Sequence, residues 1–274
     1  MSNLVTRGLA WIGLGVAFTM VGCQSVQTTR GGEVGIDRQQ RMSSFVSQAE
    51  VDATAKQQYG EIMQAAQKKE VLNRDAATTD RVRRIAQRLI PQTAVFRDDA
   101  PRWQWEVNVL TSTEVNAWCM PGGKIAVYTG LIEKLKITDD ELAAVMGHEI
   151  SHALREHARE RMGRQVATGV GLSVVEIFTG IQLGDLGQTL AQSMFVLPNS
   201  RENEQEADRI GVELAARAGY DPRAAVTLWT KMASLGGDQP PQWLSTHPSH
   251  ETRVKDLQAY SQRVLPLYEK AAKS

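Results

Sequence analysis

The chain has 274 residues but only two cysteines, so no disulfide framework can stabilise it and its fold must rest on a hydrophobic core. An excess of one charge is also missing. The 31 Lys and Arg balance 31 Asp and Glu, which excludes the positive field that nucleic-acid-binding proteins use. No apolar run reaches the roughly 18–20 residues of a membrane-spanning helix. The remaining composition, 42% hydrophobic and 23% charged, is that of an ordinary globular protein.

Residues 1–22 have the layout of a secretory signal peptide. The apolar residues 8–21 follow a short segment with one positive charge, and small residues precede Cys23. Residues 20–23 resemble a bacterial lipobox, whose cysteine carries a lipid, and Gln24 in place of Asp resembles lipoproteins sorted to the outer membrane. We therefore expect Cys23 to be a lipid attachment site at the inner face of the outer membrane, in the periplasm of a Gram-negative bacterium. The alternative is a plain signal peptide with an incidental cysteine.

The rest of the chain divides into a tether and one domain. Residues 23–50 are polar and lack sustained apolar periodicity, so we expect lipid attachment at Cys23 followed by a flexible tether. Residues 51–274 are expected to form a single domain. Apolar residues at helix spacing over 51–69 and 80–90 predict packing helices at its start.

Two short strands are predicted after these helices. Residues 103–109 alternate apolar with polar side chains, and residues 124–128 follow the turn signal Pro121-Gly122-Gly123. The two strands could pair into an antiparallel ribbon, and an exposed edge of that ribbon could accept an extended peptide. The sequence therefore predicts an α+β fold that is mainly helical, with a small antiparallel ribbon or sheet.

The most informative segment is a helix predicted over residues 139–164, which opens with a capping box at Thr138 and Glu141. It contains the sequence His148-Glu149-Ile150-Ser151-His152. Residues four apart return to within about 40° on a helix, so both histidines point from one face, as two zinc-binding imidazoles require. Glu149 is offset by one residue, where its carboxylate can take a proton from the attacking water.

A charged run follows this motif at residues 155–161. It includes His157, which is nine residues from His148 and so lies about 180° round the helix. We interpret the run as a solvated face and expect no ligand role for His157.

Zinc in a peptidase takes three protein ligands and keeps one position open. The best source of the third is the helical segment 200–209, which offers Glu202, Glu204, Glu206 and Asp208. Glu204 and Asp208 share a face at i,i+4, while the other two glutamates lie further round.

Four ordered motifs resemble the zinc metallopeptidases of the CAAX-prenyl-protease type, gluzincins that combine HExxH with a distal Glu ligand. The motifs are residues 116–124 with 129–131, the HEISH segment, the Ser-Arg-x-x-Glu-x-x-Ala-Asp signature at residues 200–208, and Thr246-His247-Pro248 with Arg253. Within this family the chain resembles the periplasmic, lipid-anchored peptidases of Gram-negative bacteria. The membrane-embedded members carry several spanning helices, which this chain lacks, so we do not expect it to share their prenylated substrates. The resemblance covers roughly residues 80–257 and implies a zincin-like fold.

The resemblance also implies roles for the carboxylates of residues 200–209. It makes Glu204 the third zinc ligand and Asp208 a partner that orients a ligand histidine. Glu206 is then expected to be a surface charge.

His247 and Arg253 are expected to act in catalysis. Hydrolysis needs a donor aimed at the developing oxyanion, and either residue could supply it. In the family the matching histidine can also sit in the open metal position and hold the enzyme shut. The alternative is a turn histidine with Arg253 in a surface ion pair. His250 is expected to be exposed.

Two further features carry weaker expectations. Residues 165–194 are rich in Gly and apolar residues, and they could form a buried hairpin, a cover over the cleft, or a surface that contacts a membrane or partner. Cys119 lies in an apolar setting and is expected to be a buried packing residue, which argues against a cysteine protease.

Together these residues predict a zinc metalloendopeptidase that holds one Zn²⁺ per chain. Its expected partners are protein and peptide substrates, in particular misfolded or unassembled envelope proteins, and possible envelope assembly factors. The alternative from another class is an outer-membrane-associated chaperone or assembly lipoprotein with latent protease activity.

Overall fold

The computed structural model describes residues 24–168, 185–235, 241–248 and 252–271. The signal peptide, Cys23, His250 and the middle of segment 165–194 lie outside the described residues. In chain order the elements are β1 (Gln24–Val26), β2 (Gln40–Met42), α1 (Gln48–Lys68), α2 (Ala76–Leu89), the 3-10 turns η1 (Ile90–Val95) and η2 (Ala100–Arg102), β3 (Glu106–Leu110), β4 (Ala117–Met120), β5 (Lys124–Tyr128), α3 (Thr129–Leu135), α4 (Asp139–Leu154), α5 (His157–Thr168), α7 (Asp185–Phe195), α8 (Arg201–Arg217), α9 (Ala224–Ser234), α10 (Gln242–Thr246) and α11 (Arg253–Ala271). The predicted α+β class, mainly helical, is confirmed. Within the described ranges, no helix is both long and apolar enough to cross a bilayer.

The central sheet has the strand order β3-β5-β4. β5 pairs antiparallel with β4 across the predicted turn, but it pairs parallel with β3. The expected antiparallel pairing of residues 103–109 with 124–128 is therefore wrong, because a strand that the sequence did not reveal lies between them in the chain. All four residues of β4 are buried, so it shows no alternation of apolar and polar side chains.

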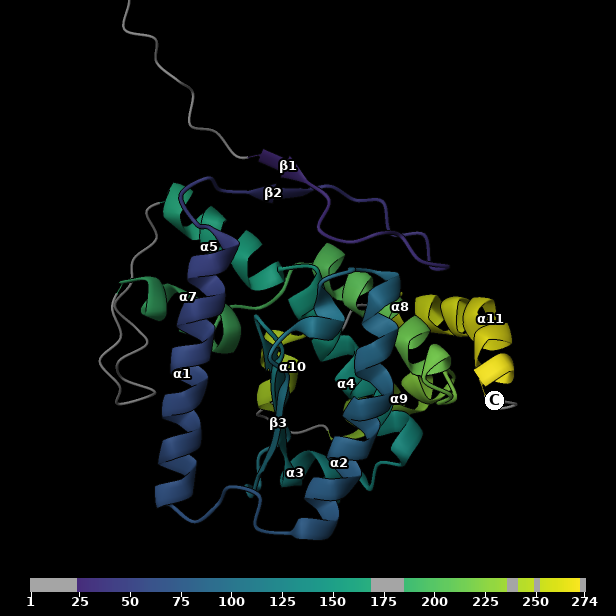
Figure 1. The fold of residues 1–274 in the computed structure, drawn as a ribbon. Coiled ribbons are helices and arrows are strands. Elements are labelled where there is room, and N and C mark those ends of the chain that lie inside the picture. The colour runs from purple at the N-terminus through teal and green to yellow at the C-terminus, as the bar shows by residue number, and fades with distance from the viewer. Residues whose placement is uncertain (1–23, 169–184, 236–240, 249–251, 272–274) are drawn as a thin grey trace, which may run out of the picture.

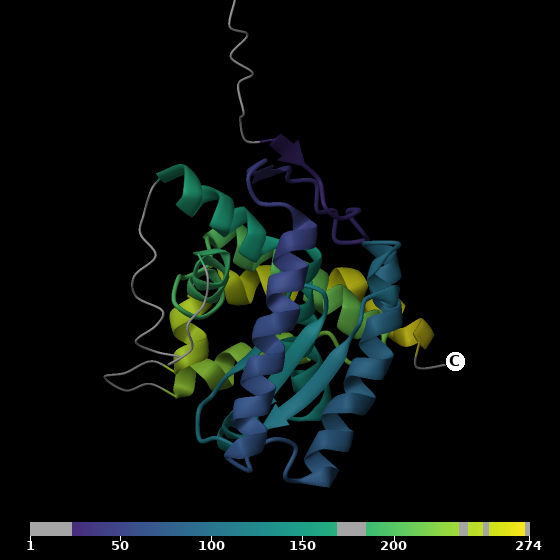
Figure 2. The same ribbon diagram turned by 60° about the vertical axis from the view of Figure 1, so that its left-hand side comes forward.

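Helices cover both faces of this sheet. On one face, Trp118, Met120 and Ala126 pack in a cluster with residues of α1. On the other face, Cys119 and Ile125 join the larger core built with α2, α4 and α8. Figure 1 shows the sheet nearly edge-on between α1 and the α2–α4 side, and Figure 2 brings α1 in front of it. This packing fixes α4 against the inner face of the sheet.

Helices α4 and α8 cross at closely apposed glycines. A Cβ atom on Gly147 would lie 2.8 Å from the carbonyl oxygen of Gly211, and one on Gly211 would lie 2.8 Å from the backbone nitrogen of His148. Because any larger residue would push the helices apart, these glycines set the distance between His148 and α8.

The helix that carries HExxH ends earlier than predicted. α4 stops at Leu154, and Glu156 takes a left-handed conformation with φ 51° before α5 begins at His157. The expected solvated face at residues 155–161 is also wrong, since Arg155 and His157 are fully buried. Their polar groups are satisfied by Glu206 on α8, which compensates for the loss of water.

The segment expected to be a flexible tether is packed against the domain. β1 and β2 form an antiparallel hairpin, and Val34, Ile36 and Met42 are buried. The polar composition was misleading because part of the anchoring is ionic: Arg38 pairs with Glu160 at 2.9 Å and with Glu206 at 2.6 Å. α1 then begins at Gln48, with a capping box between Ser47 and Glu50.

Candidate metal centre

Helix α4 places both histidines of the HExxH motif in the interior, one turn apart on the same face. Their rings are nearly perpendicular, with centroids 4.7 Å apart, and their Nε2 atoms are 3.1 Å apart. Both side chains are buried. The expected capping box of Thr138 with Glu141 is present and fixes the start of this helix.

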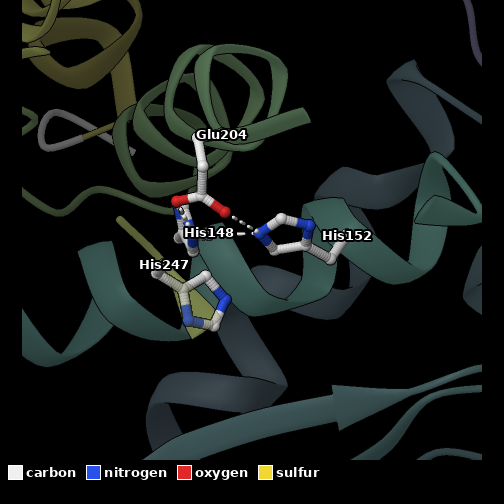
Figure 3. Close-up of side chains that lie close together, drawn as sticks. All are labelled: His148, His152, Glu204 and His247. Carbon is white, nitrogen blue, oxygen red and sulfur yellow. Dashed lines mark hydrogen bonds and ion pairs between the residues drawn. The ribbon is translucent and has the colours of Figure 1, made fainter. Parts of the chain in front are cut away.

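Helix α8 supplies the carboxylates that face these histidines. Ser200 caps its N-terminus, and Glu204 and Asp208 lie one turn apart on the side that meets α4. Glu204 Oε1 is 3.4 Å from His152 Nε2, and Glu204 Oε2 is 3.6 Å from His148 Nε2. Asp208 Oδ1 lies 2.9 Å from His148 Nδ1. Figure 3 shows Glu204 reaching from α8 toward the two histidines on α4.

The arrangement of these atoms fits a zinc ion. Asp208 accepts the Nδ1 proton of His148, so His148 Nε2 presents a lone pair. Glu204 Oε1 is buried and has no hydrogen-bond partner among the described residues. Ligands at zinc bond lengths in a tetrahedral site are separated by about 3.3 Å, which matches the spacings of 3.1, 3.4 and 3.6 Å among these donors. His148, His152 and Glu204 are therefore suited to hold Zn²⁺.

Glu149 lies beside this group on α4, and only 3% of its surface is exposed. The indole N–H of Trp243 donates to Glu149 Oε1 at 2.6 Å. Burial raises the pKa of Glu149 to about 8, an effect that the Trp243 hydrogen bond opposes. A nearby divalent cation would lower this pKa again, toward the range in which a carboxylate both takes and releases a proton.

The sequence did not identify Trp243 as a site residue. It lies on α10, four residues before His247, and the two rings stack with centroids 4.7 Å apart. The available signal was the spacing of four residues, with His247 directly after the helix that carries Trp243.

The structure brings His247 into the metal-binding group. One ring nitrogen of His247 and the donors of His148, His152 and Glu204 all lie within 4.8 Å of one another. His247 Nδ1 donates to the carbonyl oxygen of Trp243 at 3.0 Å, which leaves an Nε2 lone pair 3.5 Å from Glu149 Oε1. Burial lowers the pKa of His247 to about 3, so the ring is neutral. A neutral ring with a free lone pair favours the expected metal-blocking role over the oxyanion-donor role.

Arg253 occupies a different place from the one expected. It is fully buried, its Nη1 donates to Glu204 Oε2 and its Nη2 to Asp208 Oδ1, both at 2.7 Å. Its guanidinium also stacks on the ring of Trp229 at 3.4 Å. Arg253 therefore binds the carboxylates of Glu204 and Asp208 and is not positioned as an oxyanion donor. The alternative of a surface ion pair is wrong as well, because Arg253 is buried.

The expected exposure of Glu206 and of His157 is wrong, whereas the expected packing role of Cys119 is confirmed. Glu206 is not a surface charge: it is 5% exposed and bound by Arg155, Arg38 and His157. His157 is not exposed either: it is buried, and its Nδ1 lies beside Nδ1 of His152. Cys119 is a buried free thiol whose pKa is raised by desolvation, in agreement with a packing role.

A cleft of about 770 Å³ opens onto this centre. Glu149, His152 and His247 line one part of it, and β4 with apolar residues of α1 and α7 lines another, alongside polar residues such as Glu114 and Arg161. β4 is at the edge of the described sheet. The cleft therefore joins a strand edge to the metal-binding group.

An HExxH helix, a glutamate ligand from a second helix and a buried general base define the gluzincin class of zinc metallopeptidase. The comparisons with known proteins agree. The chain belongs to peptidase family M48, whose model matches residues 76–261. The prediction of a zinc metallopeptidase is thus confirmed.

Several characterised relatives are similar to this chain. It is 44% identical over 153 residues to the mitochondrial metalloendopeptidase OMA1 of Arabidopsis thaliana, covering 56% of this chain and 31% of that protein. It is 35% identical over 176 residues to the human mitochondrial metalloendopeptidase OMA1, covering 59% and 32%. It is 32% identical over 170 residues to the β-barrel assembly-enhancing protease of Escherichia coli (strain K12), covering 58% and 35%. The matches span about a third of the length of these relatives.

Proposed function

We propose that this chain is a zinc endopeptidase of the bacterial cell envelope that hydrolyses internal peptide bonds of misfolded or unassembled envelope proteins. Within family M48 we assign it to the CAAX-prenyl-protease type and to its lipid-anchored bacterial branch. The observation that carries the hydrolytic function is the convergence of His148, His152 and Glu204 beside the buried carboxylate of Glu149, at one end of an open cleft.

The cleft supports an extended polypeptide as the substrate. The edge of β4 can pair with an added strand through backbone hydrogen bonds, which do not depend on sequence. Beyond the metal-binding group, apolar side chains such as Ile62, Leu110, Trp118 and Phe195 line much of the cleft, together with some polar and charged residues. Unfolded envelope proteins expose both extended backbone and apolar side chains, whereas folded proteins bury them.

The residues of the site have distinct tasks in hydrolysis. When bound by His148, His152 and Glu204, Zn²⁺ polarises the scissile carbonyl and lowers the pKa of water. Glu149 takes the proton of the attacking water and passes it to the leaving amine. Trp243 occupies Oε1 of Glu149 and so directs this transfer to Oε2. Arg253 donates a charge-assisted hydrogen bond to Glu204 Oε2 and so orients this carboxylate.

The envelope location is supported by two observations from outside the site. Residues 1–22 have the pattern of a signal peptide and are followed by Cys23 in a lipobox-like sequence. One relative is named for the assembly of β-barrels in Escherichia coli, although others are named as mitochondrial enzymes.

Activity is tested on an unfolded protein such as casein. The wild type is expected to cleave it. Glu149→Gln at equal zinc content is expected to cleave it at least about 10²-fold more slowly, because the general base has been removed. Equal cleavage by both proteins would exclude the proposed chemistry. A folded protein of similar size serves as the control for substrate state.

The anchor is tested by cell fractionation. Cys23→Ser is expected to release the protein from the membrane fraction or to leave the signal uncut. Recovery of the variant in the outer membrane with the mature mass of the wild type would contradict lipid attachment at Cys23.

The second candidate is an assembly or chaperone lipoprotein whose protease is latent, and the position of His247 favours it. If His247 closes the open metal position, His247→Ala should raise the turnover of casein at unchanged zinc content. A fall in turnover would instead assign His247 to catalysis. A wild type and a His247→Ala variant that both bind zinc but cleave nothing would support a purely binding role.

A further inference from the structure

The zinc ligand His152 makes a contact that no motif predicts. Its Nδ1 atom lies 2.8 Å from Nδ1 of His157, and both rings are buried. In Figure 3 one ring nitrogen of His152 faces Glu204, while the other is turned away from the ligand group. His157 therefore contacts the side of the ring that a metal does not use.

The proton positions in this contact follow from the chemistry of the ligand. A neutral imidazole that ligates through Nε2 carries its proton on Nδ1, so His152 donates to Nδ1 of His157. His157 must then carry its own proton on Nε2. That nitrogen lies 3.0 Å from Glu206 Oε2, a carboxylate oxygen that can only accept. Each donor in the row from His152 to Glu206 meets an acceptor.

Glu206 is fixed in place by two arginines. Arg155 donates to both of its carboxylate oxygens at 2.9 Å, and Arg38 donates to Oε1 at 2.6 Å and to Oε2 at 2.9 Å. Burial raises the pKa of Glu206, but the hydrogen bonds from His157, Arg38 and Arg155 together lower it well below its usual range. Arg38 belongs to the N-terminal segment, outside the residues that match the family model.

We infer that His157 and Glu206 are positioning residues for the zinc ligand His152, and that Arg38 ties the N-terminal segment to this row. The inference rests on the zinc site and not on the proposed substrate or location. With this assignment, each of the two ligand histidines is oriented by a carboxylate of α8. Asp208 orients His148 directly, and Glu206, two residues earlier on α8, orients His152 through an intervening imidazole. With the ligand Glu204, α8 thus supplies three carboxylates at alternate positions, each with a different task.

Zinc affinity of the full chain is the measurement, made by competition with a chromophoric chelator. His157→Phe keeps the ring but removes the acceptor for His152, so zinc should bind about 10–100-fold more weakly, the usual cost of losing a partner of a ligand histidine. His157→Asn keeps an acceptor near the Nδ1 position but loses the contact with Glu206. Its zinc affinity should therefore fall less than that of His157→Phe. Glu206→Gln should weaken zinc binding by at least about 10-fold.

Glu160→Gln is the matched control. Glu160 also pairs with Arg38 and is also buried, but the hydrogen bond to His157 Nε2 comes from Glu206 and not from Glu160. Its zinc affinity should stay within about 3-fold of the wild type, well short of the losses expected for a lost partner of a ligand. The visible spectrum of the Co²⁺-substituted protein gives a second readout, because it reports ligand geometry and not stability. It should change in both His157 variants and in Glu206→Gln, but not in Glu160→Gln.

The outcomes separate this inference from the zinc site itself. A wild type that binds no zinc would contradict the proposed metal centre. A wild type that binds zinc tightly, with equal affinity and an equal Co²⁺ spectrum in His157→Phe, would overturn the positioning role alone. An equal loss in Glu160→Gln and Glu206→Gln would also overturn it. If His157→Phe does not fold, unchanged zinc binding in both His157→Asn and Glu206→Gln would overturn the positioning role in the same way.

Discussion

Gly147 on α4 and Gly211 on α8 meet so closely that the backbone of one helix lies in van der Waals contact with the backbone of the other. This crossing brings an HExxH helix and a carboxylate helix together without any side chain between them. The metal-binding group is therefore a consequence of helix packing as much as of the motif that marks it.

The first prediction concerns this crossing. Gly211→Ala should destabilise the protein by about 1–3 kcal/mol and weaken zinc binding, because its Cβ would lie 2.8 Å from the backbone of His148. Gly60→Ala is the control, since a Cβ at Gly60 on α1 meets nothing within 4 Å. Gly60→Ala should raise the free energy of unfolding of the protein by about 0.5–1 kcal/mol. Urea unfolding of the two variants measures both effects, and equal free energies of unfolding would contradict the close crossing.

The second prediction concerns Arg253. Arg253→Met should lower zinc affinity about 10-fold or more, because Glu204 and Asp208 would lose a buried charge partner. Arg209→Met is the matched control: it also removes an ion pair between α8 and α11, with Asp256, but does not contact a ligand. Chelator competition should show little change in that control. Weaker turnover at full zinc affinity in Arg253→Met would instead support the oxyanion role expected from the sequence.

Much of the site could be predicted from the sequence, because HExxH fixes two donors on one helix face and the resemblance to the family assigns roles to Glu204 and Asp208. The residues that surround the metal-binding group could not be predicted in this way. His157 lies about 180° from His148 on a continuous helix, and only the left-handed turn at Glu156 brings it beneath His152. The role of Arg253 depends on how α11 packs on α8, which has no local signal in the sequence.

The fold shows the same division. Helices with clear apolar periodicity, such as α2 and α4, are predictable, although the pattern extends α4 too far. β4 is not predictable, because a strand that is buried on both faces shows no alternation of apolar and polar side chains. The packing of residues 24–47 could not be predicted either, because Arg38 and Gln40 anchor this segment through polar contacts that composition does not reveal.

The third prediction concerns the hydrogen bond between Trp243 and Glu149. That bond lowers the pKa of Glu149, so Trp243→Phe should raise it. The acid limb of the kcat/KM profile should then move to higher pH, because the base is protonated over a wider range. Zinc content should not change. Trp103→Phe, which removes an indole hydrogen bond to Asp99 and not one to Glu149, is the control for loss of a tryptophan. An unshifted acid limb in Trp243→Phe would argue against proton transfer by Glu149.

The fourth prediction concerns Asp52 on α1. Burial, together with the charge of Glu156, raises the pKa of Asp52 to about 6, above its ordinary value of 3.8. A carboxyl whose pKa is raised by folding binds a proton more tightly in the folded state, so its contribution to stability falls as the pH rises from about 4 through 6. Asp52→Asn should therefore raise the melting temperature at pH 7.5 and lose this advantage near pH 4. A constant difference between the two proteins across this range would contradict the assignment.

The most direct test of the proposed metal centre is the zinc content of Glu204→Gln, measured by elemental analysis of the purified protein. Glu202→Gln is the matched control, because Glu202 lies in the first turn of the same helix and is exposed. We expect one zinc per chain in the wild type and in Glu202→Gln, and a loss of most of the zinc in Glu204→Gln, since two histidines alone do not complete a three-ligand site. Full zinc occupancy in Glu204→Gln, with its fold intact, would contradict the proposed metal centre.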